Sequence, residues 1–123
     1  MRGQYKRETS ETKIEIVLDT DASEYENFIV DTGIGFFDHM LLTFSRYANF
    51  KGYIKVVGDL NVDCHHTIED TGIAIGKTIK EMINEKSITR FANVHIPMDE
   101  ALVRGVIDLG GRAYLDFDYE FKR

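Results

Sequence analysis

The residues of this chain best suited to chemistry are two adjacent histidines followed by a glutamate, His65-His66-x-x-Glu69. Successive residues of a helix point about 100° apart, so the two imidazoles are expected to take different partners. Glu69 follows His65 by four residues and His66 by three, the two spacings that share a helix face. A helix start of this kind can present imidazole and carboxylate in two directions, as a site with two metal ions requires. This ligand set favours manganese, zinc, iron or cobalt over calcium.

A further histidine, His39, lies at the start of another predicted helix. Its position matches that of the double histidine, so we expect it to be a third ligand. Asp63 and Asp70 flank the motif and are candidates for orienting the imidazoles as hydrogen-bond acceptors. The alternative is that polar residues simply occupy a helix start, where the helix dipole favours a carboxylate such as Glu69. The remaining histidine, His95, has no motif around it, and we interpret it as structural.

Three other residues with reactive or charged side chains have weaker patterns. Cys64 beside His65 suggests a thiol nucleophile, but adjacent side chains are rarely placed for proton transfer, and no oxyanion motif accompanies them. Arg90 opens a predicted strand and Arg112 follows Gly110-Gly111 in a turn. Two arginines could clamp a phosphate, and solvated surface charge is the alternative that spacing leaves open. The sequence contains no phosphate loop of the G-x-x-x-x-G-K type.

The composition excludes several classes of protein. The chain has 123 residues, of which 43% are hydrophobic and 29% charged, as is typical of one compact globular domain rather than a disordered segment. The net charge is −6 and the acidic residues are spread along the chain, which disfavours a nucleic-acid partner. No apolar run approaches the roughly 18 residues of a membrane-spanning helix. The single cysteine cannot form an intramolecular disulfide, so we expect a cytoplasmic protein.

Apolar periodicity predicts the elements that must position these residues. Alternating side chains predict strands at 12–19, 28–30, 53–57, 60–63, 92–96, 102–109 and 114–121. Apolar spacings of three and four predict helices over 36–48 and from the double histidine to about 84–87. The apolar stripe expected for the first helix is Phe36, Phe37, Met40, Leu41, Phe44 and Ala48. The stripe expected for the second is Ile68, Gly72, Ile75, Ile79 and Met82 or Ile83.

The chain also contains a weak internal repeat, in which residues 11–19 align without a gap on residues 100–108. We therefore expect a first sheet-and-helix unit with the metal motif at 1–88 and the strands of a second unit at 89–123. In the first copy the histidine helix start comes 20 residues after Asp19, whereas 15 residues follow Asp108. The second copy is thus expected to stop before its first helix, and the chain to be incomplete.

Five motifs occur in order along nearly the whole chain: Glu8–Thr12, Gly33–Leu41, Gly58–Ile73, Pro97–Leu102 and Asp108–Leu115. Together they resemble the imidazoleglycerol-phosphate dehydratase family of histidine biosynthesis. The resemblance implies an α+β fold, a duplicated unit of a four-stranded sheet with two helices on one face, like domain 2 of ribosomal protein S5. It implies a hydro-lyase that dehydrates imidazole glycerol phosphate to imidazole acetol phosphate and water. It also implies homo-oligomers, with trimers assembling into a cage of twenty-four subunits and metal sites between neighbours.

The same resemblance implies a role for each candidate residue. The ligands of the first half of a site for two Mn²⁺ ions are expected to be His39, His65, His66 and Glu69. The resemblance also places Glu11 at the substrate as a general acid/base, and implies that Arg90 and Arg112 bind the substrate phosphate. Metals on the ring nitrogens of the substrate would stabilise an imidazolate and so help to expel the hydroxyl as water.

The chain departs from the family pattern in three ways. Cys64 stands where many members have an acidic residue, and Gly110 and Ala113 replace the usual serine and proline of the arginine turn. Members continue past Arg123 with a second histidine-bearing helix, another H-H-x-x-E, a lysine and further phosphate contacts. We therefore expect half of a site here, to be completed by a second chain or further segment. The alternatives are a fragment that binds metal and assembles without catalysis, and a metallohydrolase, which no nucleophile motif supports.

Overall fold

The computed structural model describes residues 1–21, 25–83 and 88–120. The chain divides into two compact units, residues 1–86 and 87–123, which are described separately here. Of the helices in the described residues, none is long and apolar enough to cross a membrane.

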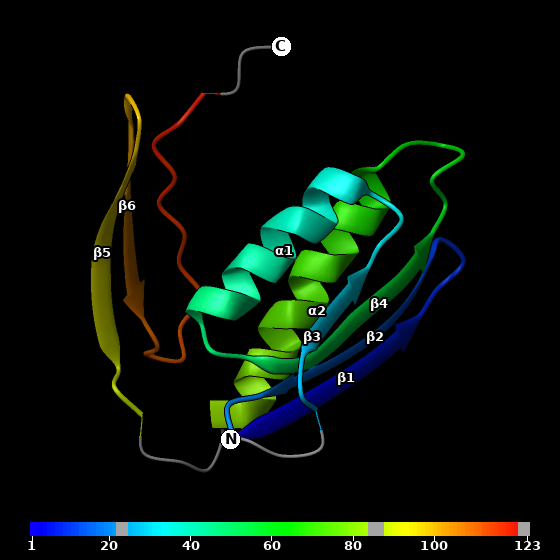
Figure 1. The fold of residues 1–123 in the computed structure, drawn as a ribbon, viewed down its shortest axis with the longest axis horizontal. Coiled ribbons are helices and arrows are strands. Elements are labelled where there is room, and N and C mark those ends of the chain that lie inside the picture. Colours follow the sequence, from blue (N-terminus) through cyan, green and yellow to red (C-terminus); the bar gives the residue numbers. More distant parts are fainter. Residues whose placement is uncertain (22–24, 84–87, 121–123) are drawn as a thin grey trace. The chain divides into compact units, whose positions relative to one another are not determined.

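The first unit is a four-stranded sheet with both helices on one face (Figure 1). In sheet order its strands are β1 (Arg2–Glu8), β2 (Thr12–Asp19), β4 (Lys51–Gly58) and β3 (Phe28–Asp31). β2 pairs antiparallel with both β1 and β4, whereas β3 runs parallel to β4. The helices are α1 (Gly35–Tyr47) and α2 (His65–Ile83). The α+β class that the resemblance implies is confirmed.

The core lies between the two central strands and the helices. Alternate residues of β2 point inward, as its apolar and polar alternation predicts, and Ile16 lies opposite Ile54 of β4 with both side chains fully buried. The core cluster consists of Ile14, Ile16, Leu18, Leu41, Ile54, Val56, Ala74 and Met82. This packing fixes α2 on the sheet and thereby fixes the direction of the side chains at its first turn.

Both predicted helices form, and the predicted apolar stripe of α2 is correct in part: Met82 is buried, and Ile75, Ile79 and Ile83 pack against the core. The buried residues of α2 are Thr67, Asp70, Thr71, Ala74, Thr78 and Met82, while Ile68 is 40% exposed. Threonines can be buried on this face because a helical threonine donates its hydroxyl hydrogen bond to the carbonyl four residues earlier and packs its methyl group. Thr71 Oγ1 donates to the Thr67 carbonyl at 2.6 Å, and Thr78 Oγ1 to that of Ala74 at 2.8 Å. A pattern that counts threonine as polar therefore misses the threonines of the inward face.

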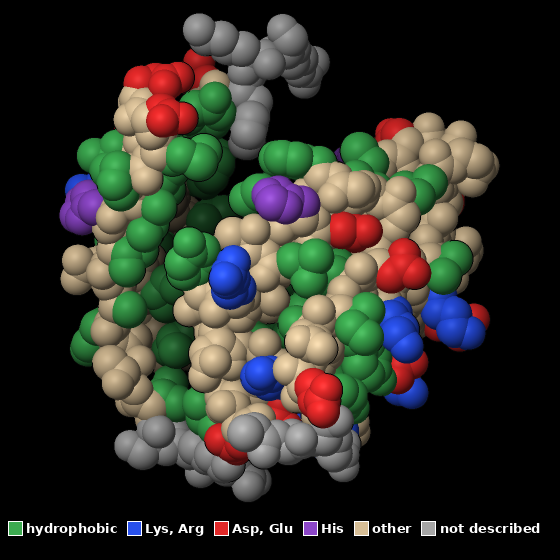
Figure 2. Space-filling view, in the orientation of Figure 1, with side chains coloured by type: hydrophobic (Ala, Val, Ile, Leu, Met, Phe, Trp, Pro, Cys, Tyr) green, Lys and Arg blue, Asp and Glu red, His purple; other side chains and the backbone are tan. Residues whose placement is uncertain are grey.

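The predicted stripe of α1 is correct in part. Leu41 is buried and Phe37 packs against the core, but Phe36 is 76% exposed, and Met40 and Phe44 are also exposed. Ala48 is the residue that caps the helix rather than part of it. The helix face of this unit consequently carries apolar side chains at its surface, which Figure 2 shows scattered among polar ones.

Strand prediction failed at two places in the first unit. β1 was not expected, because as an edge strand it carries charged residues, with Gly3 its one buried residue. A Cβ at Gly3 would lie 2.5 Å from both Met82 Cγ and the Thr78 carbonyl oxygen, so the strand approaches α2 closely. Residues 60–63 form no strand: the Val62 amide donates to the Asp59 carbonyl at 2.8 Å in a turn.

The second unit contains a hairpin of β5 (Phe91–Met98) and β6 (Ala101–Asp108). β6 begins directly after Glu100 and ends at Asp108, just as β2 begins after Glu11 and ends at Asp19, so the sequence repeat coincides with matched hairpin strands. The predicted strand at 114–121 is wrong over residues 114–120, and residue 121 lies outside the described residues. A strand requires a paired neighbour, and within the described part of this unit β6 pairs with β5 alone.

Candidate functional site

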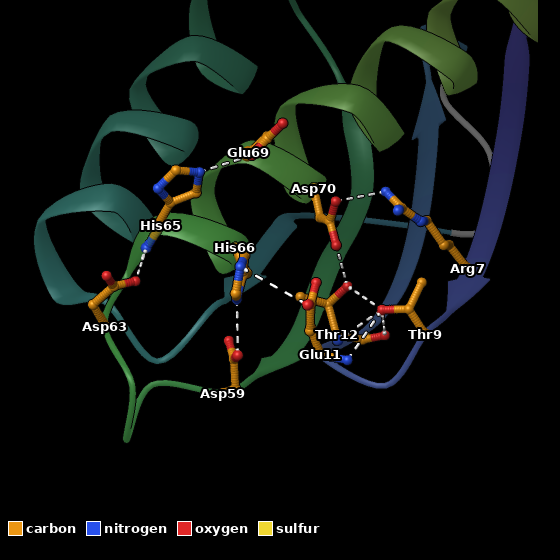
Figure 3. Close-up of polar contacts among 10 residues, drawn as sticks. All are labelled: Arg7, Thr9, Glu11, Thr12, Asp59, Asp63, His65, His66, Glu69 and Asp70. Atoms are coloured by element: carbon orange, nitrogen blue, oxygen red, sulfur yellow. Dashed lines mark hydrogen bonds and ion pairs between the residues drawn. The ribbon is translucent and has the colours of Figure 1, made fainter.

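The first turn of α2 is held by the aspartate two residues before it. Asp63 Oδ1 accepts a hydrogen bond from the backbone N–H of His65 at 2.7 Å, one of the amide groups left unpaired at a helix start (Figure 3). The sequence suggested that Asp63 orients an imidazole ring. Its carboxylate instead binds the backbone and thereby sets where the double histidine enters the helix.

The two imidazoles take different partners, as their spacing on the helix predicts. His65 Nε2 lies 3.0 Å from Glu69 Oε2, and both side chains are more than half exposed. His66 points toward Asp59 and Glu11 instead (Figure 3). The ring centroids of the two histidines are 5.5 Å apart and the ring planes are inclined at 61°.

His66 lies between two carboxylates from different elements. Its Nδ1 is 2.8 Å from Asp59 Oδ2, at the end of β4, and its Nε2 is 3.9 Å from Glu11 Oε1. The hydrogen bond with Asp59 is the largest cause of a raised pKa of His66, and the negative charges of Asp59, Glu11 and Asp63 act in the same direction. In the neutral ring, a proton on Nδ1 facing Asp59 leaves the lone pair of Nε2 free toward Glu11.

Asp59 contacts the candidate site, and the sequence reasoning had not singled it out. It precedes His66 by seven residues across an irregular turn, so no helical or strand periodicity relates the two. The Gly58-Asp59 turn lies within one of the five ordered motifs, which is the one signal that could have indicated it. Asp59 Oδ1 is buried and has no hydrogen-bond partner among the described residues, so the carboxylate has capacity for one more donor.

Glu11 lies in the turn between β1 and β2 and is about half exposed at its side chain. Its backbone carbonyl accepts a hydrogen bond from the Asp59 amide at 3.1 Å, so the turn is tied directly to the end of β4. This contact brings Glu11, Asp59 and His66 together from three elements. Such an arrangement suits proton transfer, because a carboxylate lies beside an imidazole whose other nitrogen is already fixed.

His39 is the fifth residue of α1 and is exposed. The helix start is fixed by Asp38, whose Oδ1 accepts hydrogen bonds from the backbone N–H and the hydroxyl of Thr32. Within residues 1–21, 25–83 and 88–120, no three His, Cys, Asp or Glu side chains lie close enough together to hold a metal ion. The predicted third ligand therefore does not join the α2 motif inside one chain.

The α2 motif nevertheless has the donors that a first-row divalent ion requires. An octahedral ion with bonds of about 2.1 Å separates neighbouring ligand atoms by about 3.0 Å. The 3.0 Å between His65 Nε2 and Glu69 Oε2 fits two such neighbours as well as it fits a hydrogen bond. His66 offers Nε2, and the carboxylate on its Nδ1 is the usual partner of a metal-binding histidine.

Asp70 does not orient an imidazole, contrary to the expectation from sequence. Its carboxylate is buried and binds Arg7 and Thr12 on the sheet side of α2. Asp70 follows His66 by four residues, one helical turn, so it lies beyond the imidazole along α2, where Arg7 of β1 and Thr12 of β2 bind both of its oxygens.

The two arginines lie in the second unit. Arg90 Nε and Nη2 donate to the two carboxylate oxygens of Asp108 at 2.6 and 3.1 Å, a pairing that lowers the pKa of Asp108 and raises that of Arg90. Its guanidinium carbon also lies 4.8 Å from the ring centre of Phe91. Arg112 lines a cavity of about 440 Å³ together with Arg104 and Asp108. Asp108 thus links the two arginine environments, and the sequence reasoning had not singled it out.

Comparison with known proteins identifies the same family throughout. A family model described as imidazoleglycerol-phosphate dehydratase matches residues 32–123. The imidazoleglycerol-phosphate dehydratase of Limosilactobacillus fermentum is 47% identical over 94% of this chain and 59% of its own length. That of Acidiphilium cryptum is 49% identical over 95% of this chain and 59% of its own length.

Solved structures agree. The imidazoleglycerol-phosphate dehydratase of Staphylococcus aureus superposes with a TM-score of 0.83 at 35% identity, covering all of this chain and 66% of that one. That of Pyrococcus furiosus, in complex with (S)-C348, gives 0.78 at 34% identity, covering 96% of this chain and 61% of that one. This chain spans about three-fifths of the length of the curated relatives it matches. Sequence, fold and ordered motifs converge, and the chain belongs to the imidazoleglycerol-phosphate dehydratase family.

Proposed function

We propose that this chain provides the first-half metal and acid–base residues of a manganese-dependent hydro-lyase of histidine biosynthesis in the cytoplasm. The reaction is the dehydration of imidazole glycerol phosphate to imidazole acetol phosphate and water. The observation that carries the proposal is the position of His66, with Nδ1 bonded to one carboxylate and Nε2 directed at a second. Membership of the family supports the reaction class.

Four residues are proposed to hold Mn²⁺, namely His39, His65, His66 and Glu69. When bound, the two ions of a complete site would act as Lewis acids that stabilise negative charge on the substrate's imidazole ring. In the neutral ring, Asp59 accepts a hydrogen bond from His66 Nδ1 and so favours the tautomer in which Nε2 carries the lone pair that binds a metal. His39 lies apart from the α2 motif within the described chain, which supports a site completed at a contact between subunits.

Glu11 is proposed to move the protons. The dehydration removes a weakly acidic hydrogen next to the imidazole ring and expels a hydroxyl group, so one group must accept a proton and one must donate it. The Glu11 carboxylate is half exposed, and its Oε1 lies 3.9 Å from His66 Nε2, beside the proposed metal ligand. A carboxylate there can exchange a proton with a substrate whose ring occupies the metal site.

Arg90 and Arg112 are proposed to bind the substrate phosphate. A guanidinium has five N–H donors, and the two bonds from Arg90 to Asp108 leave about three for phosphate oxygens. Asp108 therefore orients Arg90 and leaves its other N–H groups free to bind phosphate. The pairing also fixes the plane of the guanidinium, which a two-point phosphate contact requires.

Assembly is part of the proposal: trimers that build a cage of twenty-four subunits, with metal sites between neighbours. The alternative is a metal-binding half-site that assembles without catalysis. No three-residue ligand cluster forms within the described part of one chain, which fits this alternative as well as it fits a site shared between subunits.

The deciding experiment measures turnover of imidazole glycerol phosphate with Mn²⁺ by this chain alone and with the carboxy-terminal part of a relative added in trans. Turnover in either arrangement, lost in His66→Ala together with Mn²⁺ binding, supports the hydro-lyase. Metal-driven assembly with no turnover in either arrangement supports the half-site alternative. Unchanged Mn²⁺ stoichiometry in His66→Ala would contradict the ligand assignment.

A further inference from the structure

We infer that Asp70 is a positioning residue that holds the Glu11 turn at a fixed distance from the double histidine. The inference rests on the proposed function, because it assumes that Glu11 works beside His66. Asp70 itself belongs to neither the proposed ligand set nor the acid–base pair.

Asp70 reaches from α2 to the sheet with both of its carboxylate oxygens. Oδ1 accepts a hydrogen bond from Arg7 Nη1 of β1 at 2.6 Å, and Oδ2 accepts one from Thr12 Oγ1 of β2 at 2.5 Å (Figure 3). The side chain of Asp70 is 10% exposed and that of Arg7 is 29% exposed. Buried charge of this kind is costly unless it is fully paired, so the three groups hold one another in a single arrangement.

The residue bonded to Asp70 is the immediate neighbour of Glu11. Thr12 is almost fully buried, and the turn before it is closed by Thr9, whose Oγ1 accepts the backbone N–H groups of Glu11 at 3.2 Å and Thr12 at 3.1 Å. The Thr9 amide in turn donates to the Thr12 carbonyl at 2.8 Å. The turn is therefore rigid internally, and Thr12 is the point at which it is attached to α2.

A second attachment comes from β4, where the Asp59 amide donates to the Glu11 carbonyl at 3.1 Å. Both attachments lead back to His66: Asp59 binds its ring, and Asp70 lies one helical turn after it on α2. The spacing between His66 and Asp70 within a helix is constant. The position of Glu11 relative to His66 is thus set by rigid spacing and a few hydrogen bonds.

This arrangement predicts a specific defect when the α2 attachment is removed. Displacement of a catalytic group by about 1 Å can reduce the rate on the order of a hundredfold. The proposed metal ligands do not depend on Thr12, so Mn²⁺ binding should persist. A merely structural ion pair would lower stability without changing kcat of the folded protein.

The test uses Thr12→Val, which removes the hydroxyl but keeps the shape, and Thr12→Ser, which restores it. Asp70→Asn is the second variant, should the loss of charge be tolerated. The matched control is Glu81→Met, because Glu81 also joins α2 to β1, accepting the Gln4 amide at 3.2 Å, but near the opposite end of the helix, and methionine removes the accepting oxygen. Three properties are measured: kcat and KM, with this chain alone or with the added carboxy-terminal part, whichever shows turnover; Mn²⁺ stoichiometry; and hydrogen exchange of residues 8–12 in this chain.

We expect Thr12→Val to lower kcat by about tenfold or more with KM and Mn²⁺ stoichiometry nearly unchanged, and Thr12→Ser to recover most of the loss. Exchange at residues 8–12 should accelerate in Thr12→Val and not in Glu81→Met. The inference is overturned if kcat and exchange in Thr12→Val match wild type, or if Glu81→Met causes the same defect. If wild type itself shows no turnover, the proposed function fails, and unchanged exchange would then overturn the attachment separately.

Discussion

Asp59→Asn is the substitution that tests the proposed metal site most directly. It keeps the size of the side chain but removes the negative charge that faces His66 Nδ1 at 2.8 Å. The imidazole then becomes less basic and is held less firmly in the tautomer that leaves Nε2 free. Loss of such a carboxylate behind a metal-binding histidine typically weakens metal affinity by about 10- to 100-fold, or about 1.4 to 2.7 kcal/mol.

The pH dependence of Mn²⁺ affinity tests the same contact in a second way. Asp59 raises the pKa of His66 above its usual 6.5, and a protonated ring cannot bind metal. As the pH is lowered, the Mn²⁺ affinity of wild type should therefore begin to fall at a higher pH than it would with a histidine of ordinary pKa. In Asp59→Asn the fall moves to lower pH, so the deficit of the variant is largest in alkaline solution and narrows as the pH decreases.

Titration calorimetry with Mn²⁺ between about pH 6 and 8.5, the range around an ordinary histidine pKa, measures both effects. The control is Asp63→Asn in the same loop, because Asp63 binds the His65 backbone rather than a ring and asparagine serves equally well at a helix start. Equal affinity and equal pH dependence in wild type and Asp59→Asn would refute the assignment of Asp59 to His66. An equal loss in Asp63→Asn would attribute the effect to the loop as a whole.

Three further outcomes can be measured. Ile54→Ala should lower the free energy of unfolding by about 2 to 5 kcal/mol in urea titration, because the side chain is fully buried at the centre of the sheet. Gly58→Ala should also destabilise the chain, since its Cβ would lie 2.0 Å from Thr67 Oγ1, and adding Thr67→Ala should recover part of the loss. Arg112→Ala should raise KM with little change in kcat, because phosphate binding is remote from the reacting carbons; a normal KM would remove Arg112 from that role.

The sequence predicted those strands of the fold whose burial alternates along the chain. β2 presents Ile14, Ile16 and Leu18 to the helices, so its period of two is visible without any structure. β1 has no such pattern: it lies at the sheet edge, and where it meets α2 it presents Gly3, a residue that packs by having no side chain. An edge strand that pairs through its backbone leaves little trace in hydropathy.

The contacts of the candidate site also fall into those that the sequence could predict and those that it could not. Contacts within one helix follow from spacing alone, so the pairing of His65 with Glu69 and the separation of the two imidazoles could be predicted. The contact of Asp59 with His66 depends on the path of a turn, which spacing does not encode. Glu11 reaches the site through the register of a hairpin, and the resemblance to a family, rather than any local pattern, had indicated it.

The wrong assignment of Asp70 and the absence of threonines from the predicted inward face of α2 have one physical cause. Asp70 lies three residues after Thr67 and four before Ala74, so it shares the face that packs on the sheet. Once threonine is treated as a residue that satisfies its hydroxyl on its own helix and packs its methyl group, Thr67, Ala74 and Thr78 define that face. Asp70 is then placed against the sheet, one turn beyond His66 and beside the turn that carries Glu11. The direction in which the threonines of α2 point thus decides that the carboxylate of Asp70 meets Arg7 and Thr12 of the sheet.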